Sequence, residues 1–416
     1  MKILVVGSGG REHAIAWKMS QNKTIDTIYC APGNAGTEMI DVVKNIDVNT
    51  IDEIVEFADT NKIDFTIVGS EEMLVEGIVD RFHERDLTIF GPDKQAALLE
   101  GSKAYAKKFM KKYGVKTAAY ETFEDAGAAK KYLETCEYPT VIKASGLAAG
   151  KGVIICATKD EALKTIEEVM EDSKFGEAGA TVVIEEFLEG VEASILSVTD
   201  SKQIVPFISA KDHKKIGEGE TGLNTGGMGV ISPNPYVTAD VDKAFIKDIL
   251  EPTLAGIKAE GMEFCGIIFF GLMINDRGVY LIEYNMRMGD PETQVVLPLL
   301  ENDLYEVFDD TLNGRLDGEK ISWKDASACC VVAASGGYPE SYNKGMVITG
   351  ADSIEDTVFM AGVKKKEGKL LTNGGRVLNV VALGRDLDEA RSKVYGSIEG
   401  ITFDKMYYRK DIGKIN

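Results

Sequence analysis

The fold is indicated first by the stretch ILVVGSGGREH, which runs from Ile3 to His13. Its four apolar residues, Ile3–Val6, have the length and composition of a strand buried in a parallel sheet. The glycines that follow end this strand, and a helix is predicted from Glu12 to Gln21. A strand, a glycine-rich turn and a helix in this order predict the first unit of a parallel α/β domain.

The same alternation continues through the first hundred residues. Further strands are predicted at Thr27–Cys30, Phe65–Val68 and Thr88–Phe90. A helix is predicted over Ile51–Thr60, where the apolar residues fall on one face. We therefore expect an N-terminal domain, residues 1–100, with a parallel sheet covered by helices on both faces.

The remainder of the chain predicts two more domains, at 101–320 and 321–416, so that the whole is a multidomain protein of α/β and α+β class. The second domain begins with a basic helix, Lys103–Tyr113, and contains a small α+β lobe at about 115–190. The glycine-dense range Gly217–Gly229 is predicted to be a loop. The third domain is a small mixed β domain that starts near Ala326. The other expected elements are strands at Thr140–Lys143, Val153–Cys156, Thr181–Glu185 and Ala328–Ala334, helices at Asp160–Glu171 and Val241–Glu260, and hairpins at Ala193–Ser209 and Ile267–Asn285.

Composition limits the classes of partner. The 416 residues carry a net charge of −20, which disfavours binding to nucleic acid or to an anionic membrane. Six scattered cysteines and the lack of a long apolar segment indicate a cytoplasmic protein rather than a secreted or membrane one. We expect small-molecule partners, and a monomer or a weak homo-oligomer.

The first glycine loop, Gly7–Gly10, is placed to bind an anion at a helix N-terminus. The dinucleotide fingerprint requires glycine where this chain has Glu12, and the second strand ends at Cys30-Ala31-Pro32 instead of at an acid. These departures disfavour a nicotinamide oxidoreductase. Phosphate binding is favoured, and a tight turn without a ligand remains open.

A second glycine loop, VIKASGLAAGKGVI, spans Val141–Ile154 and lies between two predicted strands. It is not a P-loop, because Gly152 follows Lys151 where Ser or Thr is required. A flexible hairpin with two lysines nevertheless suits a polyphosphate, since glycine lets the backbone close over the ligand. The alternative is an ordinary long hairpin.

Two acidic stretches could bind a nucleotide and a metal. The strand that ends in Glu185–Glu192 could offer backbone groups to adenine and a carboxylate to ribose, or it could be a solvated surface. Glu283, Asn285 and Arg287 alternate along a strand and share a face. Such a set suits Mg²⁺ beside a phosphate, although Glu283 could instead pair structurally with Arg287.

The order of these motifs resembles that of the phosphoribosylamine–glycine ligases, a family of the ATP-grasp superfamily. The resemblance runs from the first strand into the last domain. It is carried by GSGGREHA (Gly7–Ala14), PGNAG (Pro32–Gly36), the Lys143–Gly152 loop, NTGGMG (Asn224–Gly229) and RMGDPETQ (Arg287–Gln294). It implies a central ATP-grasp domain with a mobile lobe, and ligation of glycine to 5-phosphoribosylamine through glycyl phosphate, in purine synthesis. ATP is then a co-substrate and Mg²⁺ or Mn²⁺ the metal.

The resemblance also implies roles for individual residues. Arg287 and Lys143 are implied as catalytic residues, with Arg287 neutralising the transferring phosphoryl group. Glu283 and Asn285 are implied as metal ligands. ATP is implied to contact Lys103, Lys143, Gly150, Lys151, Glu185, Glu186, Phe187, Leu188 and Glu192. The amino-substrate pocket is implied to contain Asp212, Lys214 and Asp290, and the 5-phosphate site Gly10, Gly374, Gly375 and Arg376.

One departure from the superfamily concerns the metal. Many ATP-grasp enzymes have another acidic ligand on the strand before Glu283, and here Ile267–Met273 contains no acid. We expect one firmly held ion and a second held only through the nucleotide. The alternatives are another ATP-grasp ligase or carboxylase, such as a biotin-dependent carboxylase, and a nucleotide sensor without turnover.

Overall fold

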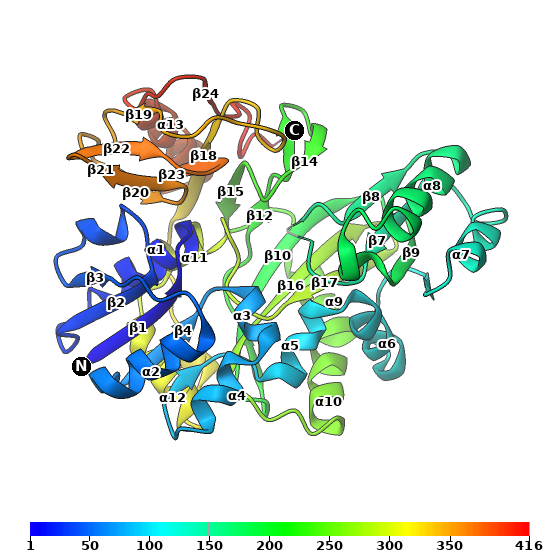
Figure 1. The fold of residues 1–416 in the computed structure, drawn as a ribbon, viewed down its shortest axis with the longest axis horizontal. Coiled ribbons are helices and arrows are strands. Elements are labelled where there is room, and N and C mark those ends of the chain that lie inside the picture. The colour runs from blue at the N-terminus through cyan, green and yellow to red at the C-terminus, as the bar shows by residue number, and fades with distance from the viewer. Residues whose placement is uncertain (149, 416) are drawn as a thin grey trace.

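The computed structural model describes residues 1–148 and 150–415. Its N-terminal sheet is parallel, as predicted, in the order β3-β2-β1-β4-β5 (Figure 1). Because the strand order changes direction between β1 and β4, the loops after these two strands open a crevice at the carboxyl edge of the sheet. The strands are β1 (Lys2–Gly7), β2 (Thr27–Pro32), β3 (Val43–Asn45), β4 (Phe65–Val68) and β5 (Ile89–Phe90), and the helices are α1 (Gly10–Met19), α2 (Ile51–Asn61), α3 (Glu71–Glu76), α4 (Ile78–His83) and α5 (Lys94–Gly101).

A small lobe follows helix α6 (Lys103–Tyr113) and projects to the right in Figure 1. Its antiparallel sheet has the order β6-β9-β7-β8 and is covered by two helices. Ala129, Leu133 and Ile142 belong to a separate apolar core between the sheet and these helices. The elements are β6 (Tyr120–Phe123), α7 (Ala126–Tyr132), β7 (Thr140–Ala144), β8 (Val153–Cys156), α8 (Lys159–Ile166) and β9 (Val182–Glu186).

The central sheet is antiparallel, in the order β11-β10-β16-β17. Its strands are β10 (Val191–Thr199), β11 (Ile204–Pro206), β16 (Gly266–Asn275) and β17 (Gly278–Asn285), so both predicted hairpins are present. The predicted helix at 241–260 is α9 (Ala239–Phe245), a π-helical turn and α10 (Glu251–Ala259). Two further helices, α11 (Thr293–Leu299) and α12 (Leu304–Leu312), share an apolar core with α1 and the N-terminal sheet.

The C-terminal sheet has the order β12-β15-β18-β23-β20, with β24 also on β18. Two of its strands, β12 (Lys211–Asp212) and β15 (Gly229–Ser232), come from the range assigned to the second domain, and the boundary at 320 and 321 stays a prediction. The prediction of a loop over Gly217–Gly229 was wrong, because Thr221–Asn224 (β14) pairs with Lys215–Gly217 (β13). The remaining elements are β18 (Ser327–Ser335), β19 (Val347–Ile348), β20 (Thr357–Met360), β21 (Val363–Lys366), β22 (Lys369–Thr372), β23 (Arg376–Gly384), α13 (Leu387–Ile398) and β24 (Met406–Tyr407).

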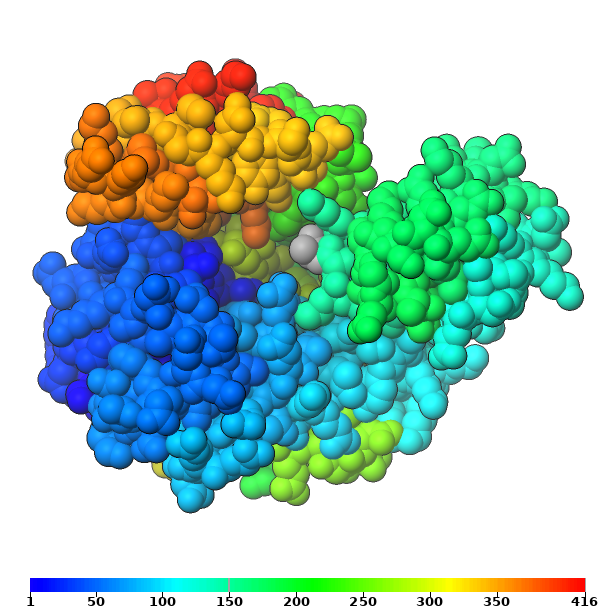
Figure 2. Space-filling model, viewed as in Figure 1, coloured from blue at the N-terminus to red at the C-terminus, as the bar shows by residue number. Residues whose placement is uncertain are grey.

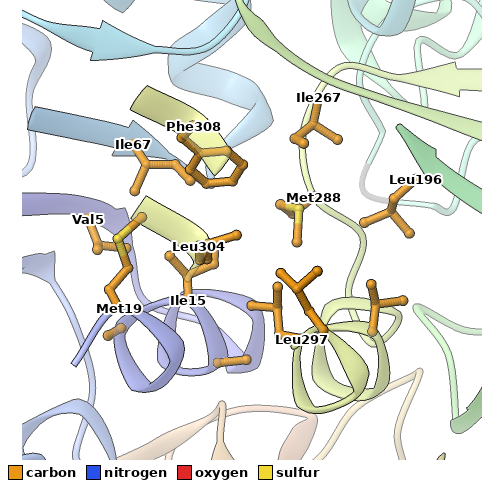
Figure 3. Packing of buried hydrophobic residues seen from close by; sticks show 14 of the residues in the cluster. Val5, Ile15, Met19, Ile67, Leu196, Ile267, Met288, Leu297, Leu304 and Phe308 are labelled. Carbon is orange, nitrogen blue, oxygen red and sulfur yellow. The ribbon is translucent and has the colours of Figure 1, made fainter. Parts of the chain in front are cut away.

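The largest core joins all three regions of the chain. Val5 and Ile15 of the N-terminal domain lie near Leu304 and Phe308 of α12, and Met288 lies in the same cluster (Figure 3). The rings of Phe90 and Phe308 stack with centroids 4.1 Å apart. Met288 is 2% exposed, so its burial fixes the segment between β17 and α11. In the described residues, no helix has both the length and the apolarity needed to cross a bilayer.

Candidate active site

Glu283 owes its orientation to a β-bulge in β17. Leu281 and Glu283 pair with consecutive residues of β16, so Ile282 is an extra residue in the strand. Leu281 is buried before the bulge and Tyr284 after it. Without the bulge, Glu283 would point into the apolar core beside Leu281. With it, Glu283 and Asn285 lie on the face of β17 that points away from the apolar core and toward the other residues of the site.

Three lysines from different elements act through their charges on the Glu283 carboxylate. Lys103 starts α6, Lys143 lies in β7, and Lys214 follows β12. Burial opposes ionisation of Glu283, but the charges of Lys214, Lys143 and Lys103 hold its pKa below the usual value. Glu283 is therefore an anion in a cationic environment, which is the state required of a metal ligand. The surface is hollowed between the small lobe and the two terminal regions (Figure 2).

Arg287 is held by two carboxylates from the N-terminal part of the chain. Its Nη2 lies 2.9 Å from Glu100 Oε1, and its Nε lies 3.4 Å from Glu71 Oε2. Glu71 is also 3.6 Å from Nη2 of Arg11. Arg287 Nη2 donates a hydrogen bond of 3.3 Å to Asn285 Oδ1. The alternative in which Arg287 pairs with Glu283 is not realised, since the ion pairs of Arg287 within the described chain go to Glu71 and Glu100.

Glu185, expected beside adenine, lies between two buried lysines. Its carboxylate oxygens are 3.0 Å from Nζ of Lys107 and 3.0 Å from Nζ of Lys143. Burial lowers the pKa of Lys107 to about 8. The backbones of Glu185 and Glu186 lie within the sheet between β6 and β7. The backbone leaves the sheet after β9, at Phe187 and Leu188, which were expected beside adenine together with Glu185 and Glu186.

The second glycine loop packs closely at both ends. A Cβ on Gly146 would lie 2.7 Å from Ala178 Cα, and one on Gly152 would lie 2.8 Å from Ala148 Cβ. Lys103 Nζ donates to Gly146 O at 3.3 Å, which brings the predicted phosphate-binding lysine to the loop. Gly150 has φ +75° and open space around it, and Lys151 is exposed. Ala149 lies outside the described residues.

The expected ribose and amino-substrate residues are neighbours. Lys214 Nζ lies 3.0 Å from Glu192 Oε2, and the charges of Glu192 and Glu283 raise its pKa. Asp212 is 7% exposed, and its Oδ1 is a buried acceptor without a hydrogen-bond partner in the described chain. Burial and the charge of Glu292 raise the pKa of Asp212 well above its usual value. The unpartnered Oδ1 can therefore accept a hydrogen bond from a donor group that enters the site.

Asp290 joins the N-terminal loop to the C-terminal sheet. Arg376 Nη2 lies 3.4 Å from Asp290 Oδ1, and Nη1 donates to Asp290 O at 2.9 Å and to Gly226 O. Burial opposes ionisation of Asp290, but Arg376 and Arg11 hold its pKa below the usual value. Arg376, expected in the 5-phosphate site, thus lies against Asp290, expected in the amino-substrate pocket.

The glycines of the first loop and of the C-terminal turn also have packing reasons. A Cβ on Gly10 would lie 2.6 Å from Gln294 Nε2. A Cβ on Gly374 would lie 2.9 Å from Gly362 Cα, and one on Gly375 would overlap the ring of Tyr338. These contacts require glycine whether or not a phosphate binds there. The 5-phosphate assignment therefore depends on Arg376 more than on the glycines.

Glu12 fills the crevice that a dinucleotide would need. It is 1% exposed, and its Oε2 accepts a hydrogen bond of 2.6 Å from Gly9 N. A Cβ on Gly69 would overlap its Oε1, so the glutamate packs tightly against the turn after β4. A carboxylate in this place repels a pyrophosphate, which is the physical reason against the nicotinamide alternative.

The donor set around β17 fits a magnesium or manganese ion. Glu283 supplies an ionised carboxylate and Asn285 an amide oxygen from the same face of the strand. Mg²⁺ is commonly bound by one or two protein oxygen ligands, with phosphate and water completing its octahedron.

Several residues of this region were missed by the sequence reasoning. Glu71 and Glu100 pair with Arg287, and Lys107 pairs with Glu185. Arg11 pairs with Glu71, Glu292 accepts a hydrogen bond from Ser194, and Gln294 donates one to Asp290. The turn Gly69-Ser70-Glu71 at the end of β4 was a signal for Glu71, because ligands in parallel sheets bind at such strand ends. The missed residues are Arg11, Glu71, Glu100, Lys107, Glu292 and Gln294.

Comparison with known proteins gives full-length matches. Three family models of phosphoribosylglycinamide synthetase match in chain order: the N domain at 1–100, the ATP-grasp (A) domain at 101–293 and the C domain at 328–415. A phosphoribosylamine–glycine ligase of Fusobacterium nucleatum is 59% identical, over 100% of this chain and 99% of its own.

Two solved structures have similar folds. The crystal structure of a phosphoribosylamine–glycine ligase from Thermotoga maritima has a TM-score of 0.86 at 36% identity, and the match covers 99% of this chain and 100% of the other. A biotin carboxylase from Campylobacter jejuni has a TM-score of 0.76 at 16% identity, covering 99% and 94%. The second likeness concerns the fold alone.

Proposed function

The chain belongs to the phosphoribosylglycinamide synthetase family, and from this premise we propose how its residues perform the ligation. The protein is an ATP-dependent carbon–nitrogen ligase of purine synthesis. It joins glycine to 5-phosphoribosylamine and gives glycinamide ribonucleotide, ADP and phosphate. The biotin carboxylase alternative is not favoured, because that likeness is confined to the fold.

In the first half-reaction, a carboxylate oxygen of glycine attacks the γ-phosphorus of ATP. The bond from phosphorus to the β,γ-bridging oxygen breaks, ADP leaves with that electron pair, and glycyl phosphate forms. Lys103 and Lys143 offset the charge of the phosphates, and Arg287 neutralises the phosphoryl group in transfer. This chemistry needs positioning and charge compensation more than a protein nucleophile.

Glu283 and Asn285 would hold the divalent ion. The ion, when bound, supplies charge stabilisation at the phosphate oxygens. Lys103, Lys143 and Lys214 keep Glu283 ionised and thus ready to bind it. We predict that the ion is Mg²⁺ or Mn²⁺ and that a second ion binds only through the nucleotide.

In the second half-reaction, the amine of phosphoribosylamine attacks the acyl carbon of glycyl phosphate. A carbon–nitrogen bond forms, the acyl carbon–oxygen bond breaks, inorganic phosphate leaves, and the nitrogen loses a proton. Asp212, Lys214 and Asp290 line the pocket for the amino substrates, and Arg376 with the Gly10 loop binds the ribose 5-phosphate. Glycyl phosphate is thereby formed next to the pocket from which the amine attacks it.

The observation that carries this assignment is the bulge at Ile282, which turns Glu283 toward Lys103, Lys143 and Lys214. The test is ADP release with each substrate omitted in turn. Release that depends on glycine supports the proposal, whereas release that depends on bicarbonate contradicts it. ATP binding without any turnover would instead indicate a nucleotide sensor.

We also propose a cytoplasmic location. All six cysteines are free thiols, and Cys30, Cys156, Cys329 and Cys330 are buried. Free thiols in a chain of this size suit a reducing compartment.

A further inference from the structure

The loop that carries the proposed amino-substrate residues is held by a distant stretch of the chain. We call residues 211–229 the substrate loop, and residues 406–413 the clamp segment. The substrate loop begins with β12, forms the β13–β14 hairpin and ends at β15. The hairpin rises beside the C-terminal domain (Figure 1).

Arg409 is the centre of the contact between the two segments. It is 1% exposed, although it carries a permanent charge. Its Nη1 donates to Lys215 O at 2.9 Å, and its Nη2 donates to Glu220 Oε1 at 2.8 Å. Asp411 accepts from Nε and from Nη2, each at 2.8 Å. A single guanidinium thus connects the first residue of β13 and the turn before β14 to the clamp segment.

Further hydrogen bonds tie the clamp segment to the hairpin and to His213, including one of 3.3 Å from Lys410 N to Glu218 Oε1. Tyr407 Oη donates to Ile216 O at 2.7 Å, and Gly219 N donates to Asp411 Oδ2 at 2.8 Å. Gly413 N donates to His213 Nε2 at 3.3 Å. His213 lies between the two substrate-pocket residues, Asp212 and Lys214.

The ring of His213 fixes the backbone on both sides. Because Nε2 accepts from Gly413, the proton of the neutral ring is on Nδ1, which lies 3.2 Å from Gly229 O and donates to it. The His213 backbone pairs with the same end of the loop, since its N donates to Gly229 O at 2.9 Å and its O accepts from Met228 N at 2.8 Å.

The clamp segment is itself anchored to the C-terminal domain. Its first residues form β24, which pairs with β18. Tyr395 of α13 donates through Oη to Arg409 O at 2.9 Å and accepts from Ile412 N at 2.9 Å. Arg391 Nε donates to Ile412 O at 2.9 Å. The clamp segment therefore transmits the position of a rigid sheet and helix to the substrate loop.

We propose that Arg409 is a positioning residue for the ligation, which acts through the clamp segment to hold Asp212 and Lys214 in the amino-substrate pocket. The inference rests on the proposed function of these two residues. A buried charge is a costly way to gain stability alone, since apolar residues of the same volume often serve as well. A guanidinium that bonds a backbone carbonyl and two carboxylates instead defines one geometry.

The test compares Arg409→Ala, Arg409→Lys and Tyr407→Phe with the control Val394→Ala. Val394 is fully buried in α13 and its side chain makes none of the hydrogen bonds to the clamp segment, so its truncation loosens the same domain while those bonding groups stay present. In Arg409→Ala we expect the KM for phosphoribosylamine and glycine to rise about tenfold or more, while the Kd for ATP stays within about twofold. Arg409→Lys restores part of the loss, and hydrogen exchange accelerates within residues 211–229.

Other outcomes overturn the inference. If Val394→Ala raises the same KM values at equal loss of melting temperature, Arg409 acts only through stability. If Arg409→Ala does not fold, Tyr407→Phe decides, since it removes one hydroxyl, and an unchanged KM for both amino substrates in that variant contradicts the clamp. Asp212→Asn distinguishes a failure of the proposed substrate pocket from a failure of the clamp. An unchanged KM in Asp212→Asn overturns the pocket and the inference together, whereas a raised KM there with unaltered Arg409 variants overturns the clamp alone.

Discussion

Two of the three histidines are buried, and their rings accept hydrogen bonds from the backbone. His13 of α1 is 6% exposed, and its Nδ1 accepts a hydrogen bond of 2.9 Å from Met360 N. Burial lowers the pKa of His13 to about 4, and that of His213 to about 3. A protonated Nδ1 could not accept the bond from Met360, so the neutral ring joins the first helix to the C-terminal sheet.

The neutral state of the buried His13 ring predicts that the protein loses stability in mild acid. Its pKa is lower in the folded protein than the 6.5 of the unfolded chain, so the unfolded state takes up the proton first as the pH falls. His13 therefore contributes stability that is complete above pH 6.5 and is lost toward pH 4, about 3 kcal/mol in all. Urea unfolding at pH 7.5 and 4.5 measures the effect. His13→Gln should reduce the difference, whereas His83→Gln, at an exposed position of α4, should leave it unchanged.

Glu283→Gln should lower kcat by roughly a hundredfold or more, because several kcal/mol of charge stabilisation depend on the ion that Glu283 is proposed to hold. The melting temperature should fall little, since the amide keeps the size of the side chain. Activity is measured across a Mg²⁺ titration, with exposed Glu189→Gln as the control. A near-normal kcat at every Mg²⁺ concentration contradicts the metal role.

The carboxylates that pair with Arg287 could not be predicted from local sequence patterns. Glu100 lies 187 positions before Arg287 in the chain, and no local pattern connects them. Their ion pair of 2.9 Å exists because α5 and the segment after β17 pack together in the folded chain. The types of the site residues could be predicted from motifs, but their partners depend on tertiary packing.

At the scale of secondary structure elements, the bulge in β17 explains both a correct prediction and an omission. Spacing of two correctly put Glu283 and Asn285 on one face, because both follow the bulge. The sequence could not tell which face, since Leu281 and Ile282 are both apolar and either could have pointed inward.

The β13–β14 hairpin was not predicted because its strands lack an alternating apolar pattern. Its strands are short and glycine-rich, and they are stabilised by Arg409 instead of by an apolar pattern.

The loop between β7 and β8 is expected to close over the nucleotide. Residues Gly146–Gly152 should exchange amide hydrogens faster without nucleotide than with a nonhydrolysable ATP analogue, because phosphate contacts with Lys151 must offset the conformational freedom of the glycines. Hydrogen exchange measures the change, and the β10–β16 pair serves as an internal reference. Equal protection in both states contradicts a lid.

A variant tests the same element independently. Gly150 has φ +75°, and a Cβ on it would meet no other atom within 4 Å, so Gly150→Ala strains only the backbone. We expect a severalfold higher KM for ATP and an unchanged melting temperature. An unaltered KM for ATP would show that the left-handed backbone at this position is not needed for binding.

At the scale of the whole molecule, residues of three domains come together at the candidate site. Asn34 donates to Ser8 O and to Met360 O, each at 2.8 Å, and so links the first glycine loop to β20. Asp290 and Arg376 complete the link from the central segment to β23. The predicted three-domain fold class and the family resemblance are confirmed. How the domains face one another could not be predicted from the sequence, because that depends on contacts such as these and on the shared core around Met288.

The Arg376 side chain is expected to contact the ribose 5-phosphate. If Arg376 binds the ribose 5-phosphate, Arg376→Ala removes charge-assisted hydrogen bonds worth about 1.5–3 kcal/mol. The KM for phosphoribosylamine should then rise about ten- to a hundredfold, at about 1.4 kcal/mol per decade. Arg376→Lys should recover only part of this, because one ammonium cannot replace a guanidinium whose Nη1 reaches the carbonyls of Gly226 and Asp290 while its Nη2 lies 3.4 Å from Asp290 Oδ1. The KM for ATP should barely move, since its proposed lysines lie on α6 and β7.

Steady-state kinetics for each substrate check this expectation, and Arg385→Ala is the matched control. Arg385 belongs to the same domain, but its side chain is 89% exposed and pairs only with Glu389 in the described chain. A surface charge of this kind is worth a few tenths of a kcal/mol, so the control should behave as the unaltered enzyme. An unchanged KM for phosphoribosylamine in Arg376→Ala removes the phosphate assignment. An equal rise for all three substrates, with a lower melting temperature, shows instead that Arg376 serves only to hold Asp290 and Gly226 together across the domains.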